Sequence, residues 1–338
     1  MIEIDGSYGE GGGQILRTAL CLSAVTGKEF MINNIRQGKQ NPGLKAEHLS
    51  CIKALKDLCN AEVEGDVIES KQLFFRPKSL QQRELNIDIG TAGSITLVLQ
   101  SLAIPIILTN SKALITGGTD VMWSPSIDYF KNVIAPALNP LGKLDVALVR
   151  RGYFNKGGGI VEVKGERKEP ESSIKQEIII TERIGKPMLF GVSHAAKPLA
   201  SARVAERQAD SAKKLFPNAD IKTEYSNSLC LGSGISIFAK YDNCILGADN
   251  VGEKGIVAEK IGLLAAEKLK GEIDSNAPVD EHLADNLIPL LGICGGEIKA
   301  SRISNHCLTN IYVAEKFLDV KFEVTKDKVV RAIKQKNQ

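Results

Sequence analysis

One local pattern, a helix that ends in a short turn and runs into an alternating strand, occurs three times along the chain. It is visible at residues 58–63, 141–146 and 318–322. In the first two copies it is preceded by a strand, a glycine-containing turn and an apolar helix, and Gly90 and Gly93 correspond to Gly6 and Gly9. Repeats of this kind bury the apolar faces of their sheets against one another. The sequence therefore predicts an α/β (α+β) fold in which three repeated βαβαββ units form a large domain.

Apolar stripes with helical spacing mark the main helices of these units. They are expected at residues 14–25, 44–59, 94–103, 127–141, 281–291 and 310–318. The rhythm changes between the second and third copies, where helices are expected at 201–216 and 256–269 with strands between them. We interpret residues 182–274 as a smaller inserted α/β domain, and residues 1–181 with 275–338 as the large domain. The charged stretch 164–171 is expected to be a solvated turn, and residues 334–338 are expected to fray.

Charge and composition exclude several classes of protein. The 338 residues carry 43 Lys and Arg against 40 Asp and Glu, which excludes a strongly basic nucleic-acid coat but allows a local basic groove. The longest apolar stretch, residues 95–108, is shorter than the roughly 20 residues that span a bilayer, and it is interrupted by polar side chains. The first residues lack the pattern of a signal peptide. Seven cysteines without a Cys-x-x-Cys pair favour reduced thiols in a cytoplasmic protein, with neither zinc nor disulfides.

A glycine-rich run at residues 9–17 leads into the first helix. Glycines ahead of a helix allow backbone N–H groups to approach an anion, and Arg17, one turn into the helix, could meet a phosphate. The run fits neither the P-loop nor the dinucleotide-binding pattern, so a tight turn and an anion site are equally good interpretations of the motif alone. Glu10 within the run repels phosphate unless a divalent cation lies between them.

Other polar residues are less specific by themselves. The basic loop 36–43 is more simply a solvated turn, and Gln100 in an aliphatic helix is more simply a buried amide that ties backbone groups. His282, Asp285 and Asn286 share one face of a helix. This face is either the rim of a ligand-binding site or a solvated surface.

His306 stands in a polar turn just ahead of the helix expected at 310–318. The positive end of a helix dipole disfavours imidazolium and keeps a neutral nucleophilic nitrogen, so His306 is a candidate covalent nucleophile. A histidine hydrogen-bonded in a loop explains the same residue more simply when it is taken alone. His48 is expected to be structural, and His194 is expected in an uninformative loop of the insert.

Taken together, these motifs resemble the RNA 3′-terminal phosphate cyclase family, in its catalytic type. The resemblance runs in order from residue 1 to about residue 324 and rests on segments 5–6, 9–17, 35–44, 93–100, 117–120 and 306–310. It implies the same three-unit fold with a small insert. It also implies ATP-dependent closure of an RNA 3′-terminal phosphate to a 2′,3′-cyclic phosphodiester, with release of pyrophosphate and AMP. In this family a histidine forms a covalent bond to AMP, and His306 occupies its position.

The resemblance also assigns roles to further residues. Positions that line the family's nucleotide pocket are matched by Gln100, Pro125, His282, Leu283, Ala284, Asp285 and Asn286. Glu10 matches a position beside the nucleotide and a divalent cation, Mg²⁺ or Mn²⁺. Arg17, Arg36 and Lys39 match positions that hold substrate phosphates. Lys39 stands where many members carry arginine. The lysine presents a point charge in place of the bidentate fork of a guanidinium group.

Two other functions remain as alternatives. Some relatives of the family are non-catalytic RNA-binding proteins of ribosome assembly, but they lack the histidine that this chain has at position 306. Enolpyruvyl transferases share the repeat-built architecture, but the cluster of substrate-binding lysines expected of them is not evident. The expected partner is RNA with a 3′-terminal phosphate. No association with a membrane is expected, and the sequence is compatible with a homo-oligomer.

Overall fold

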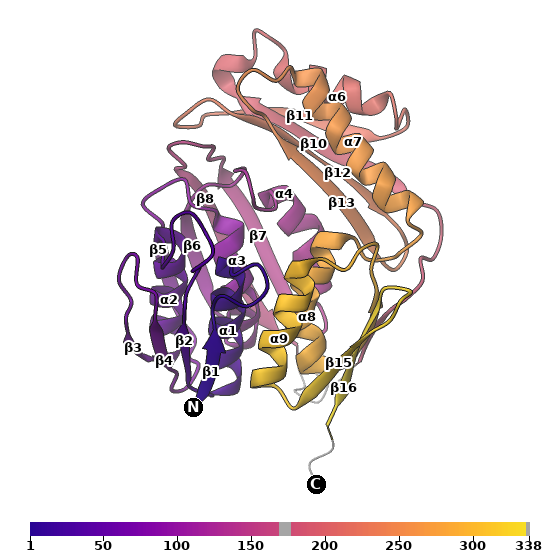
Figure 1. Cartoon of the computed structure of the whole chain (residues 1–338). Helices are drawn as coiled ribbons and strands as arrows, with labels where there is room; N and C mark the ends of the chain where they lie inside the picture. Colours follow the sequence, from indigo (N-terminus) through magenta and orange to yellow (C-terminus); the bar gives the residue numbers. More distant parts are fainter. Residues whose placement is uncertain (169–176, 336–338) are drawn as a thin grey trace.

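The computed structural model describes residues 1–168 and 177–335, and within them the three predicted units are present (Figure 1). Each unit forms a four-stranded sheet. Its first two strands pair in parallel, and the fourth strand pairs antiparallel with the second. The strand orders are β1-β2-β4-β3, β5-β6-β8-β7 and β9-β14-β16-β15, so the same topology occurs three times. The fold class predicted from the sequence is confirmed.

The elements of the first unit are β1 (Ile2–Asp5), α1 (Gly13–Thr26), β2 (Phe30–Asn33), α2 (Ala46–Cys59), β3 (Glu62–Glu64) and β4 (Leu73–Arg76). Those of the second are β5 (Glu84–Asp88), α3 (Ile95–Leu108), β6 (Lys112–Gly117), α4 (Ile127–Tyr129), a π-helical turn (Phe130–Ile134), α5 (Ala135–Ala137), β7 (Gly142–Arg150) and β8 (Gly159–Arg167). Those of the third are β9 (Ile178–Ile180), α8 (Glu281–Cys294), β14 (Gly296–Lys299), α9 (Asn305–Phe317), β15 (Val320–Val324) and β16 (Val329–Lys334).

Between β9 and α8 the chain builds a fourth sheet of order β11-β10-β12-β13. Its elements are β10 (Met188–Ala196), a 3₁₀ turn (Lys197–Leu199), α6 (Val204–Lys213), β11 (Asp220–Ser226), β12 (Ser233–Lys240), β13 (Ile245–Val251) and α7 (Ala258–Asp274). Figure 1 shows α6 and α7 on the side of this sheet that faces away from the three units. Of the two predicted ends of this part, residue 182 lies between β9 and β10, and residue 274 is the last residue of α7. Whether either part folds as an independent domain stays a prediction.

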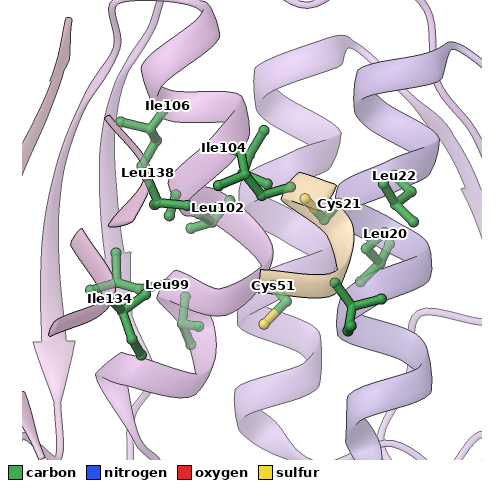
Figure 2. Close-up of a cluster of buried hydrophobic side chains, with 14 of the residues drawn as sticks. Leu20, Cys21, Leu22, Cys51, Leu99, Leu102, Ile104, Ile106, Ile134 and Leu138 are labelled. Carbon is green, nitrogen blue, oxygen red and sulfur yellow. The ribbon is translucent and has the colours of Figure 1, made fainter. Parts of the chain in front are cut away.

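The centre of the large body is a bundle of helices rather than a sheet. In α1 every residue from Ile15 to Ala24 is buried, because α2, α3 and α9 all pack around this helix. Figure 2 shows the part of the core where Leu20 and Cys21 of α1, Cys51 of α2 and Leu99 and Leu102 of α3 meet. A helix that is apolar all round is typical of such a central position. Any charged side chain on α1 is therefore held in place by close packing.

Several predicted boundaries are wrong by a few residues. Helix α3 continues through Pro105 to Leu108 instead of ending at residue 103, because a proline near the end of a helix removes only one hydrogen bond. The helix expected at 127–141 contains a π-helical turn and ends at Ala137. In the insert, α6 begins later than residue 201, and α7 extends past residue 269 to Asp274.

The predictions for the charged stretch and the last residues are only partly tested. Residues 164–167 belong to β8 and not to a turn, whereas residues 169–171 lie outside the described part of the chain. Strand β16 includes Lys334, and residues 336–338 lie outside the described part as well. All seven cysteines are free thiols, as the sequence predicted. Across the described ranges, no helix has both the length and the apolar character needed to cross a membrane.

Candidate active site

The glycine-rich run connects β1 to the buried helix α1 and lies against α9. Gly12 is the N-cap of α1 and offers no side-chain acceptor, so the first N–H groups of this helix lack a side-chain cap. Gly9 has a positive φ of 59°, and a Cβ atom placed on it would lie 2.8 Å from Oγ1 of Thr309 in α9. The run and the start of α9 therefore touch, although they are separated by almost the whole sequence.

His306 lies at this contact, with its side chain 48% exposed. Its Nε2 is 3.5 Å from Oε2 of Glu10, and the side-chain amide of Gln14 donates a hydrogen bond of 3.2 Å to its backbone carbonyl. The prediction that His306 precedes the helix is wrong by one turn. Helix α9 begins at Asn305, so the imidazole is on the first turn of the helix and closer to its positive end.

The position of His306 favours an uncharged imidazole. Burial lowers the pKa of His306 below its ordinary value of 6.5, and the Glu10 carboxylate raises it in the opposite direction. Three neighbouring basic groups lower it further: Arg17, Lys39 and His282. Glu10 thus lies in direct reach of the ring, and the charges of three further predicted site residues act on it.

Ser304 fixes the start of α9. Its hydroxyl accepts a hydrogen bond of 2.9 Å from the backbone N–H of Cys307 and donates one of 2.5 Å to the Asp285 carboxylate. Burial raises the pKa of Asp285 to about 7, although the bond from Ser304 opposes this increase. The Asn310 amide donates to the backbone carbonyl of Asp285 at 2.6 Å. These contacts tie the first turn of α8 to the helix that carries His306.

Arg17 is the buried cation of the site. It is 8% exposed, and its Nε donates a hydrogen bond of 3.1 Å to the side-chain carbonyl of Gln100 on α3. Within the described residues no carboxylate lies within 4 Å of its guanidinium. A buried charge without a paired countercharge is costly unless an anion compensates it. Arg17 and Gln100, predicted separately, are thus direct partners at a place suited to an anion.

Arg36 and Lys39 lie on the loop between β2 and α2. Nη1 of Arg36 donates to the backbone carbonyls of Asn41 and Gly43 at 2.9 and 3.2 Å, so part of this guanidinium stabilises its own loop. Lys39 is half-buried, and among the described residues it makes no ion pair. Lys39 therefore has a free ammonium group near His306, whereas only part of Arg36 is available to a ligand.

His48, which the sequence indicated as structural only, lies beside Gly13 near Arg17. It is 1% exposed, its Nδ1 accepts a hydrogen bond of 3.0 Å from the N–H of Lys45, and burial lowers its pKa to about 3. The neutral ring then carries its proton on Nε2, which lies against Gly13 and 3.9 Å from Oε1 of Glu47 but has no hydrogen-bond partner in the described part of the chain. The sequence signal that could have indicated this role is the position of His48, one turn after the basic loop 36–43.

The residues expected to hold the nucleotide surround the start of α8. The carbonyl of Pro125 accepts a hydrogen bond of 2.7 Å from Thr96, one helical turn before Gln100 on α3. Leu283, Ala284 and Asp285 are buried, whereas His282 is exposed and its ring makes an edge contact of 6.2 Å with Tyr129. Asn286 donates to the carbonyl of His282 at 2.7 Å. Of this segment, His282 and Asn286 offer side chains to a ligand, while Asp285 is engaged by Ser304.

A second polar cluster lies where the insert meets the second unit. In the described residues, Asp120, Asp128 and His194 are close enough to hold a metal ion, with ligand atoms within 4.8 Å of one another. Arg151 already supplies a positive charge there, 3.0 Å from Asp120 and 2.8 Å from Asp128. We assign it as a buried ion-pair cluster. The expectation for His194 is wrong, since it lies on strand β10, buried, 3.3 Å from Asp120.

Comparison with known proteins gives one consistent result. The family model described as RNA 3′-terminal phosphate cyclase matches residues 8–324. A protein named RNA 3′-terminal phosphate cyclase from Pyrococcus abyssi is 46% identical over 98% of this chain and 100% of its own length. Proteins of the same name from Pyrococcus furiosus and Methanosarcina mazei are 48% and 43% identical, each over 96% of this chain and 95% and 97% of their own lengths. This chain therefore belongs to the RNA 3′-terminal phosphate cyclase family.

Proposed function

We propose that the protein converts the 3′-terminal phosphate of RNA to a 2′,3′-cyclic phosphodiester at the expense of ATP, through a covalent bond between His306 and AMP. The observation that supports this most directly is the half-exposed His306 imidazole on the first turn of α9, 3.5 Å from Glu10 of the glycine-rich run. Full-length relatives named for this activity support the general reaction.

The proposed reaction has three steps that balance. A neutral nitrogen of His306 attacks the α-phosphorus of ATP, so that a P–N bond forms and the bond to pyrophosphate breaks. An oxygen of the RNA 3′-phosphate then attacks the same phosphorus and releases the histidine. Finally the neighbouring 2′-OH loses its proton and attacks the activated 3′-phosphorus, which expels AMP. Dividing the reaction through a covalent intermediate replaces one difficult displacement by easier ones.

The charges around His306 fit the phosphates of these steps. Among the described residues, Arg17 is buried without a carboxylate within 4 Å and Lys39 makes no ion pair. The Nε2–H of His48 lies beside Arg17 and has no hydrogen-bond partner there, although Oε1 of Glu47 is 3.9 Å away. We propose that these groups, with the free part of Arg36, hold the RNA phosphate and the phosphates of ATP. Gln100, Pro125 and the 282–286 turn would position the nucleoside.

Glu10 fits a role beside a divalent cation. Mg²⁺ is commonly held by one or two carboxylates together with substrate phosphates and water, so a single half-exposed carboxylate next to the expected α-phosphate is a sufficient protein ligand. When bound, Mg²⁺ or Mn²⁺ would neutralise charge on the phosphates. Glu10 itself opposes the lowering of the His306 pKa, so it also orients and polarises the ring.

The labelling of His306 tests the proposal. Incubation with α-labelled ATP and Mg²⁺ should produce an acid-labile label on the protein, which RNA with a 3′-phosphate should discharge and RNA with a 3′-hydroxyl should not. The His306→Ala variant should carry no label. Leu308→Ala is the matched control, since Leu308 lies in the same helical turn and is 44% exposed.

A non-catalytic RNA-binding role is the second candidate. It predicts that the wild-type protein binds RNA but takes up no label from ATP at any divalent cation concentration. A label that survives in His306→Ala would also contradict the proposed intermediate, because it would place AMP on another residue.

A further inference from the structure

The loop between β6 and α4 presents the only tryptophan of the chain to solvent. Trp123 is 92% exposed and has a positive φ of 68°. A bulky side chain in this left-handed region is uncommon and strained, and it persists only where the surrounding structure enforces it. The fold thus maintains a large apolar ring in water at a strained position.

The two ends of this loop are fixed. On one side Asp120 is bound to Arg151 in the buried ion-pair cluster, and its backbone N–H donates to the carbonyl of Gly152. On the other side the carbonyl of Pro125 accepts the bond from Thr96 of α3. Only the tip between these points is free of such bonds to other elements. The exposure of Trp123 is therefore a property of a braced loop.

A second exposed ring lies on the adjoining loop between β7 and β8. Phe154 is 75% exposed, and the residue before it, Tyr153, pairs with Asp120 through a backbone bridge. The same turn carries Lys156, which is exposed and makes no ion pair with any described residue. Two outward-facing aromatic rings and a free cation are thus combined on two loops that are joined at their bases.

Both loops contact segments that lead toward Arg17. A Cβ atom on Gly157 would lie 2.7 Å from the carbonyl oxygen of Thr91, and one on Gly93 would lie 3.5 Å from Cβ of Glu47. Glu47 precedes His48 and is close enough to Arg17 to act on its charge. The loop of Phe154 thus packs against the segment that leads into α3, and the loop of Trp123 is connected to Arg17 through Thr96 and Gln100 of the same helix.

We propose that Trp123 and Phe154, together with Lys156, form a stacking surface for the unpaired nucleotides that precede the 3′ end of the RNA. The inference rests on the proposed function, because it takes the 3′-phosphate to be held by Arg17. Proteins that bind single strands without sequence preference combine aromatic rings for base stacking with cations for the backbone. Both are present here, on loops whose contacts lead through α3 to Arg17.

Intrinsic fluorescence tests this directly, because Trp123 is the only tryptophan. A 3′-phosphorylated single-stranded oligoribonucleotide should quench the emission in the absence of ATP, with a midpoint that matches its binding constant. Polyphosphate of equal charge and ATP alone should leave it nearly unchanged. Quenching by ATP alone would assign Trp123 to the nucleotide pocket and overturn the proposal.

Variants separate RNA binding from chemistry. In Trp123→Ala the KM for RNA should rise about tenfold, as expected for the loss of one stacked base. Labelling of His306 by ATP should be unchanged, and Trp123→Phe should restore most of the affinity. Phe154→Ala should have a smaller effect of the same kind. Val149→Ala on β7, which also removes an exposed apolar side chain, should match the wild type.

The possible failures can be distinguished. If His306 is not labelled in the wild type, the proposed function itself fails. If labelling is normal but Trp123→Ala binds RNA as tightly as the wild type, only the stacking surface is refuted. Concentration-dependent association that Trp123→Ala abolishes, without any change in RNA affinity, would assign the surface to a second copy of the chain instead.

Discussion

The contact between Gly9 and Thr309 allows a quantitative test of how the two ends of the chain form the site. In Gly9→Ala the new methyl group would lie 2.8 Å from Thr309 Oγ1, and the residue would have to keep a φ of 59°. The left-handed conformation costs an alanine about 1–2 kcal/mol, and overpacking adds about 1–3 kcal/mol. Thr309 cannot rotate away freely, because Oγ1 donates a hydrogen bond of 2.7 Å to the carbonyl of Asn305.

The expected result is displacement of the glycine-rich run, and with it Glu10, from His306. A cost of at least about 2 kcal/mol corresponds to a loss of about thirtyfold or more in the rate of His306 labelling by ATP. The second substitution Thr309→Ala removes the obstructing oxygen, so Gly9→Ala/Thr309→Ala should recover about tenfold, the crowding part of the cost. Wild-type labelling by Gly9→Ala, or a double variant no better than the single one, would refute this account.

A matched control distinguishes this effect from glycine replacement in general. Gly271 lies in α7, and a Cβ atom on it would meet nothing within 4 Å. Gly271→Ala should label normally and unfold at a slightly higher temperature, because alanine is the better helix former by about 1 kcal/mol.

Two further predictions concern charge. Lys39 lowers the pKa of His306, so Lys39→Gln should raise that pKa and move the acid limb of the labelling rate to higher pH. Glu10 raises the pKa of His306, so Glu10→Gln should move the acid limb to lower pH. A rate profile measured from pH 5 to 8 that shifts in neither direction would contradict the assignment. Arg151→Met removes the charge that pairs with Asp128 and Glu224 and leaves Asp120 with His194 alone as a basic partner. This should reduce the free energy of unfolding by about 3–5 kcal/mol in a denaturant titration, and an unchanged midpoint would contradict the pairing.

Local sequence patterns predicted the repeats because each unit repeats its own periodicity and turns. They could not predict the buried contacts that join distant units. The pairing of Arg17 with Gln100 depends on how α1 packs against α3, and neither helix alone contains that information. The same holds for His194, whose polar surroundings come from Asp120 and Tyr153 of another unit.

The candidate site was predicted from the resemblance and not from local patterns. The motif at residues 9–17 allowed a tight turn as well as an anion site, and His306 alone was more simply a loop residue. The structure adds that both segments meet at Gly9 and Thr309. The local pattern predicts the start of α9 too late. The N-cap residue Ser304 is bonded to Asp285 of α8, and a short-range pattern does not reveal a partner on another helix.

The insertion point has a consequence for how the protein is made. Strand β9 pairs with β14, so the third sheet cannot close until the ribosome has produced the whole intervening insert. The glycine-rich run emerges before the insert, and α9 emerges after it. A nascent chain that ends before α9 therefore lacks the juxtaposition of Glu10 with His306.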